Sequence, residues 1–149
     1  MIPLDPDDVR LLAIAERPPR YALGAYEFTR DAVGYASHVV FATGTHVTGP
    51  ELCEAIRRLA NERFGALAGD VLASWGIRRT EDFGDIVFRM IEGGFLSKTE
   101  DDRPEDFRDV YSIPATFTRT AYWQERFGDA DGEAPPHHGS EPRSEASRP

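Results

Sequence analysis

The sequence lacks the features that mark secreted, membrane-spanning and nucleotide-binding proteins. It has one cysteine, Cys53, so no internal disulfide can form. It has no glycine-rich phosphate loop and no serine-nucleophile elbow. No apolar run approaches the length of a membrane span. The start, MIPLDPDDVR, is acidic and interrupted by proline, whereas a secretory signal needs basic residues and an unbroken apolar stretch. We therefore expect a cytoplasmic protein with no cofactor and no metal.

The composition is that of a folded domain followed by a polar tail. The chain has 149 residues, 40% of them hydrophobic and 11% aromatic, which predicts one globular domain over residues 1–127. From residue 128 to 149 the large apolar residues give way to Gly, Pro, Ser and Glu, which is typical of disorder. The net charge is −9. Because an acidic protein repels phosphate backbones and anionic membranes, this charge favours basic partners.

The spacing of apolar residues predicts helices, with one region of mixed structure near residues 66–113. Thr48-Gly49-Pro50-Glu51 is a capping-box pattern that predicts a helix up to Phe64. Helices are also expected over 66–75, 80–92 and 114–127, and Gly93-Gly94 ends the one over 80–92. Two runs with apolar residues, 95–99 and 107–113, flank a polar loop and predict a β-hairpin. Helix, turn, helix and hairpin in this order form a winged helix-turn-helix. The expected fold class is therefore α+β: a mostly helical bundle with a winged-helix-like element.

One long string carries a resemblance to a known family. It runs WGIRRTEDFGDIVF, then LSKTE, then EDFRDVY, between Trp75 and Tyr111. On this string the chain resembles a family of short bacterial proteins of unknown function. The resemblance extends more weakly over residues 21–117. It implies no activity, cofactor or catalytic residue.

The charges of the expected winged helix oppose DNA binding. A DNA-binding surface neutralises phosphates with Arg and Lys. The expected reading helix instead begins with three acids, and the hairpin tip is also acidic. We therefore expect a non-catalytic interaction module or regulator that contacts another protein, with a DNA-binding transcriptional regulator as the alternative. The candidate binding residues are Arg78, Arg79, Glu81, Asp82, Asp85, Lys98, Asp101, Asp102 and Asp106.

Two further interpretations stay open. Arg78 and Arg79 could pair with Glu81, Asp82 or the acids of the hairpin and merely fix the loop, in pairs that contribute about 0–1 kcal/mol each. An uncharacterised enzyme with an acidic site is a second alternative, because Asp82 and Asp85 share one helix face and could hold a proton or a metal. Acids at a helix start more often serve as caps.

Overall fold

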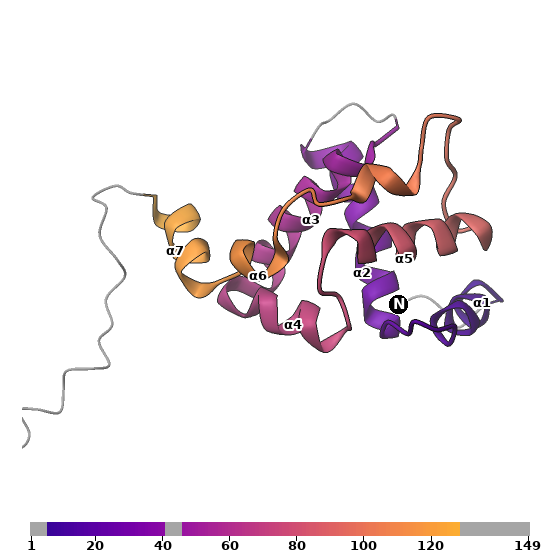
Figure 1. The fold of residues 1–149 in the computed structure, drawn as a ribbon, viewed down its shortest axis with the longest axis horizontal. Helices are drawn as coiled ribbons and strands as arrows, with labels where there is room; N and C mark the ends of the chain where they lie inside the picture. Colours follow the sequence, from indigo (N-terminus) through magenta and orange to yellow (C-terminus); the bar gives the residue numbers. More distant parts are fainter. Residues whose placement is uncertain (1–5, 41–45, 129–149) are drawn as a thin grey trace, which may run out of the picture.

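The computed structural model describes residues 6–40 and 46–128. Within these residues the chain forms helices joined by turns and loops (Figure 1). Seven segments are α-helices: α1 (Pro6–Ala15), α2 (Leu23–Tyr35), α3 (Gly49–Phe64), α4 (Ala68–Ser74), α5 (Thr80–Glu92), α6 (Ile113–Thr116) and α7 (Arg119–Phe127). The π-helix η1 (Ala36–Val40) continues α2, and η2 (Gly65–Leu67) and η3 (Pro104–Phe107) are 3-10 helices.

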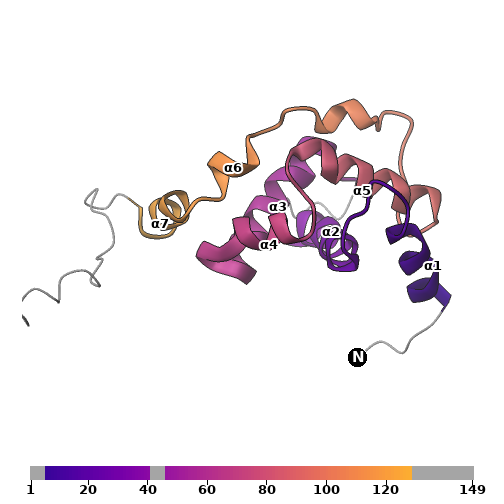
Figure 2. The same cartoon turned by 60° about the horizontal axis from the view of Figure 1, so that its bottom comes forward.

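Helix α2 lies at the centre of the fold. It packs against α1, α3 and α5, as the two ribbon views show (Figures 1 and 2). Tyr26 of α2, Ile56 of α3 and Phe83 of α5 are fully buried in one cluster of apolar side chains. That cluster extends from Leu11 to Phe117, so α1 and the segment after α5 both close over the same core.

The capping of α3 confirms the expectation for that helix. The Thr48 hydroxyl accepts a hydrogen bond from the backbone N–H of Glu51, and the Glu51 carboxylate accepts one from the N–H of Thr48. This reciprocal capping box satisfies two N–H groups that a helix start leaves unpaired. Helix α5 spans residues 80–92 as expected, whereas the helix expected over 66–75 begins with the 3-10 turn η2.

The expectation of an α+β fold is wrong. Within residues 6–40 and 46–128 there is no strand, and the expected hairpin over 95–113 contains turns, η3 and the start of α6 instead. The winged-helix interpretation of residues 66–113 therefore lacks the β-hairpin that would form the wing. The fold of the described residues is all-helical.

Hydrogen bonds to other elements explain why the hairpin does not form. The backbone N–H groups of Phe95 and Leu96 bond to the carbonyl oxygen of Met90 at the end of α5. On the other side, the buried Thr80 hydroxyl donates to the carbonyl oxygen of Phe107 and accepts from the N–H of Val110. These backbone groups are therefore satisfied by α5. The two apolar runs pack on α5 and do not pair with each other.

The described chain after α5 ends in two short helices. The hydroxyls of Ser112 and Thr118 cap α6 and α7 by accepting from the N–H groups of Ala115 and Ala121. The single helix expected over 114–127 is therefore divided. The tail expected to be disordered lies outside the described residues, except for Gly128 at the end of α7.

Candidate functional site

The carboxylate of Asp82, in the first turn of α5, is engaged with backbone groups. Its Oδ2 atom accepts hydrogen bonds from the N–H groups of Arg78 at 2.7 Å and Arg79 at 3.1 Å. Its Oδ1 atom accepts a 2.9 Å hydrogen bond from the hydroxyl of Tyr21. Asp82 therefore caps the start of α5 and ties this helix to the residues before α2.

Tyr21 lies between two carboxylates. Its hydroxyl oxygen is also 2.8 Å from Oδ2 of Asp85. Burial raises the pKa of Tyr21, and the hydrogen bonds to Asp85 and Asp82 raise it further. The phenol therefore keeps its one hydrogen, which the two carboxylate oxygens share. The acids that the sequence offered as a catalytic pair are here joined by a mostly buried tyrosine.

The other charged residues at the start of α5 differ in whether their side chains form contacts. The Glu81 carboxylate accepts a 3.3 Å hydrogen bond from the backbone N–H of Asp109. The side chains of Arg78 and Arg79 are exposed, and no carboxylate in the described part of the chain forms an ion pair with either. The backbone N–H groups of the two arginines bond to Asp82, but side-chain ion pairs with Glu81 or Asp82 do not account for their guanidinium groups.

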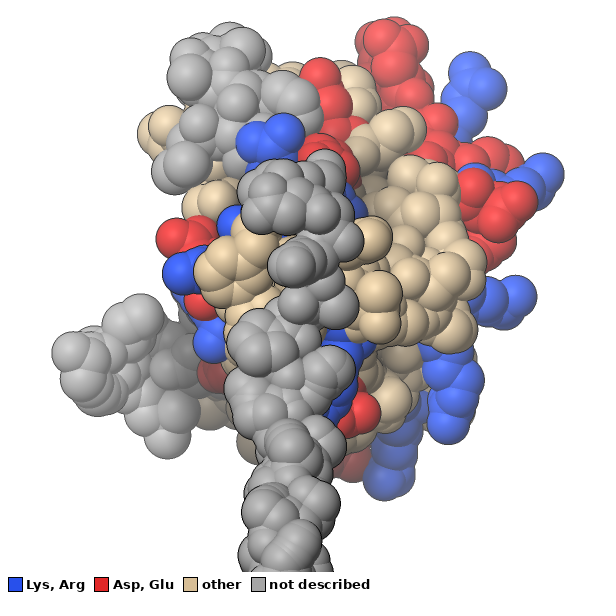
Figure 3. Space-filling view, turned by 90° about the vertical axis from the view of Figure 1, so that its left-hand side faces the viewer, with Lys and Arg blue, Asp and Glu red and all other residues tan. Residues whose placement is uncertain are grey.

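The remaining candidate residues lie between α5 and α6. Lys98 and Asp101 are exposed, whereas Asp102 and Asp106 are partly buried and line a pocket. On the face seen in Figure 3, Asp and Glu side chains gather at the upper right, with Lys and Arg side chains mostly below them. The predicted site residues thus form two groups, one at the start of α5 and one beside the pocket.

The pocket has a volume of about 510 Å³ and is open on one side. It lies between the end of α2, the start of α3, the second half of α5 and the segment that follows α5. Its apolar lining comes from all four, namely Val33, Leu52, Val87, Phe88, Ile91 and Leu96, with Val47, Phe95 and Phe107 beside them. A cavity of this size and character lies within the range of ligand-binding pockets.

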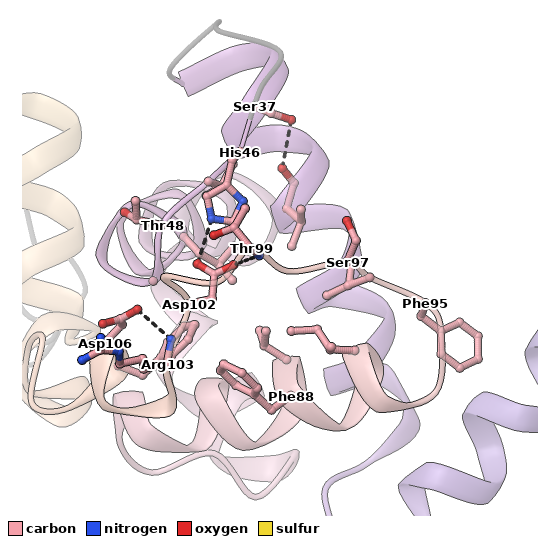
Figure 4. A pocket seen from close by; sticks show the side chains of 18 residues that line it. Ser37, His46, Thr48, Phe88, Phe95, Ser97, Thr99, Asp102, Arg103 and Asp106 are labelled. Atoms are coloured by element: carbon pink, nitrogen blue, oxygen red, sulfur yellow. Dashed lines mark hydrogen bonds and ion pairs between the residues drawn. The ribbon is translucent and has the colours of Figure 1, made fainter.

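A histidine–aspartate pair crosses the rim of the pocket (Figure 4). Nε2 of His46 lies 2.8 Å from Oδ1 of Asp102, and the Oδ2 atom of this aspartate accepts a 2.8 Å hydrogen bond from the N–H of Thr99. The Asp102 side chain is 15% exposed and that of His46 is 38% exposed. The pair joins the residues before α3 to the segment after α5 across the opening.

A second aspartate holds the other end of the rim. Asp106 accepts a 3.1 Å hydrogen bond from the backbone N–H of Arg103, which caps η3. Asp106 also lies directly against Gly49 of α3, where an added Cβ would be 2.8 Å from the Cβ of Asp106. Only glycine lets the two segments approach so closely.

The turn after α5 forms a third side of the pocket. Gly93 and Gly94 follow the helix, and the chain turns back so that Phe95 and Leu96 reach the pocket. The guanidinium groups of Arg10 and Arg30 lie 4.8 and 5.8 Å from the centre of the Phe95 ring. Such cation–π contacts hold the ring at the edge of the opening.

The sequence alone missed most of this pocket. Of its lining residues only Asp102 and Asp106 were among the candidates. His46 was not among them, although its Nε2 lies 2.8 Å from Oδ1 of Asp102 at the rim. Two patterns in the sequence were relevant to the pocket. Gly93-Gly94 marks the end of one helix and Thr48-Gly49 marks the start of another, and the loops at these two distant places in the chain meet at the pocket.

No protein-family model, curated protein or solved structure matches the chain. Among the described residues, no helix is both long and apolar enough to cross a membrane. In the same residues, no three His, Cys, Asp or Glu side chains form a group suited to a metal ion. A functional interpretation therefore depends on the geometry of the pocket and on its charges.

Proposed function

We propose that the protein is a non-catalytic interaction module that receives an apolar side chain of a partner protein in the pocket between α2, α3, α5 and residues 95–107. The observation that carries this proposal is the combination of an open apolar floor with a polar rim. Protein interfaces concentrate their binding energy in this way, with an anchor side chain in a water-free pocket inside a polar ring.

The polar groups at the rim are already hydrogen-bonded within the protein, and this favours a protein over a polar metabolite as the ligand. Asp102 already accepts bonds from His46 and Thr99, Asp106 accepts one from Arg103, and Ser37 donates to the carbonyl oxygen of Val33. A metabolite pocket uses a few precisely placed, free polar groups to orient its ligand. Here the interior offers mainly apolar contact, and apolar contact is what an anchor side chain needs.

DNA binding by α5 has less support. A winged helix uses its wing as well as its reading helix, and the segment after α5 forms no hairpin. The first turn of α5 carries Glu81 and Asp82, which would lie near phosphates and repel them, so Arg78 and Arg79 just before the helix would have to neutralise them.

A photo-crosslinking experiment tests the proposal. The crosslinker p-benzoylphenylalanine is placed at Ser97, which is exposed on the rim, or at Ala73, which is exposed on α4 away from the pocket. In the source cells, we expect a discrete adduct with another protein from position 97 and none from position 73. No adduct, or the same adducts from both positions, would contradict the proposal.

The partner identified in this way is then tested with purified proteins. Ser97→Trp places a large ring at the opening without altering a buried position, and Ala73→Trp is the matched control. We expect Ser97→Trp to weaken the dissociation constant at least about tenfold in isothermal titration calorimetry. Equal affinity of the two variants would remove the pocket from the interface.

A further inference from the structure

We infer that the partner segment is basic: an apolar anchor side chain flanked by Lys or Arg. This inference rests on the proposed function, because it names the chemistry of what enters the same pocket. It is carried by the charges that surround the opening. The charged residues around the opening therefore select the class of partner, and the apolar residues inside the pocket supply the contact.

The segment that forms one wall of the pocket is strongly acidic. Between residues 98 and 106 it carries five carboxylates, Glu100, Asp101, Asp102, Glu105 and Asp106, against two cations, Lys98 and Arg103. Among the residues that line the pocket itself, two carboxylates face one guanidinium and His46. The opening is therefore negative on the side of this segment.

These carboxylates are not neutralised within the protein. In residues 6–40 and 46–128, none of the five forms an ion pair with a lysine or an arginine. The contacts of Asp102 and Asp106 go to backbone N–H groups and to His46, and the side chains of Glu100, Asp101 and Glu105 are exposed. A cationic partner would therefore find acids whose charge is still available.

Partly apolar basic side chains suit such an opening. Lys and Arg carry long alkyl stems that cover apolar surface while the charged end stays in water. Their charges would meet the acids of residues 100–106 while a neighbouring apolar side chain enters the pocket. Complementary charges raise the association rate and fix the register of a complex, and the effect weakens with salt.

A peptide-display selection tests the class of partner. Random twelve-residue peptides on phage are selected on the full-length protein and counter-selected on Ser97→Trp, so that only pocket-dependent binders remain. We expect these peptides to combine a large aliphatic or aromatic residue with neighbouring Lys or Arg. Pocket-dependent peptides that are neutral or acidic would overturn the inference and leave the proposed function standing.

Charge variants provide the second measurement. The triple variant Glu100→Gln, Asp101→Asn, Glu105→Gln removes three charges without touching Asp102 or Asp106. The matched control, Glu16→Gln, Glu27→Gln, Asp70→Asn, removes three exposed carboxylates elsewhere. By fluorescence anisotropy, we expect the selected peptides to bind the first triple variant at least about fivefold more weakly and the control unchanged, with a smaller difference at 500 mM than at 50 mM NaCl.

The outcomes separate the two proposals. Equal affinity of wild type and the first triple variant overturns the inference of a basic partner. A selection that yields no peptide dependent on the pocket contradicts the proposed function, and the inference is then overturned with it.

Discussion

The hydroxyl of Thr80 donates a 2.7 Å hydrogen bond to the carbonyl oxygen of Phe107. The hydroxyl oxygen of Thr80 also accepts a 3.1 Å hydrogen bond from the backbone N–H of Val110. Thr80 is fully buried at the start of α5. One side chain therefore satisfies two backbone groups of a segment that has no regular hydrogen-bonding pattern of its own.

Thr80→Val should destabilise the protein by about 1–3 kcal/mol, because it leaves a carbonyl and an N–H without a partner. The matched control is Thr29→Val. Thr29 is equally buried, but its hydroxyl donates only to the carbonyl oxygen of Ala25, within its own helix. We expect this control to cost much less in urea denaturation, and equal losses would contradict the bridging role of Thr80.

Asp82→Ala should lower the free energy of unfolding by about 2 kcal/mol, because α5 loses its cap and Tyr21 loses one of its two acceptors. Asp85→Ala is the comparison, since it leaves the capping bonds of Asp82 in place. We expect a smaller loss from it in the same urea titrations. The opposite order would show that the shared phenol matters more than the cap.

Gly69→Ala and Gly34→Ala should have effects of opposite sign. A Cβ at Gly69 would lie 2.6 Å from the carbonyl oxygen of Phe117, whereas one at Gly34 would meet no atom within 4 Å. Overpacking should cost about 1–3 kcal/mol at Gly69, and the gain in helix propensity should stabilise by about 0.5–1 kcal/mol at Gly34. Thermal melting of the two variants checks this, and a stabilising Gly69→Ala would contradict the close contact.

Cys53 should resist alkylation while the protein is folded. It is fully buried, and burial together with the charge of Glu81 raises the pKa of its thiol from 9.0 to about 12. The thiolate fraction at pH 8 is therefore far lower than for an ordinary thiol. We expect iodoacetamide to label the native protein far more slowly than the urea-unfolded protein, as followed by mass spectrometry. A Cys53→Ala, Ser97→Cys variant, with its thiol exposed on the rim, should be labelled rapidly in the native state.

Acid should weaken the ion pairs that Glu54 makes within α3. Hydrogen bonds from Arg57 and Arg58 lower the pKa of Glu54 below its usual 4.5, although partial burial opposes the shift. Because the folded-state pKa is lowered, this carboxylate stabilises the fold above its unfolded pKa and the contribution is lost as the pH falls through the folded value. Glu54→Gln should therefore cost about 0–1 kcal/mol at pH 7 and less at pH 3 than at pH 7. Urea titrations at both values check this, with Glu27→Gln, at an exposed position, as the control.

Local patterns predicted the helices well because their signals are local. Thr48 and Glu51 lie three residues apart, so the capping box that starts α3 is visible in the sequence and is confirmed. Gly93-Gly94 likewise marks the end of α5. In both cases the stabilising groups are neighbours along the chain.

The hairpin prediction failed because the deciding contacts are distant in sequence. The runs 95–99 and 107–113 have apolar residues at intervals that suit strands. Their backbone groups are bonded to Met90 and Thr80 instead, and no spacing rule shows a bond between Thr80 and Phe107. The pocket was missed for the same reason, since it exists only where α2, α3 and α5 meet.

The winged-helix interpretation therefore assigned these acids to the wrong place in the fold. Asp102 and Asp106 were expected at the tip of a hairpin, but they line the rim of a pocket. The other interpretations of these residues, including the resemblance to a bacterial family and the contact with another protein, stay predictions.

The last helix of the described residues, α7, contains no buried residue. An ion pair between Arg57 of α3 and Glu125, together with contacts to η2, holds it against the rest of the chain. Opening α7 would uncover little apolar surface, so its free-energy cost is far below that of global unfolding. The protein therefore has a cooperative interior that ends near Phe117, and α7 is an appendage that can detach while the interior remains intact.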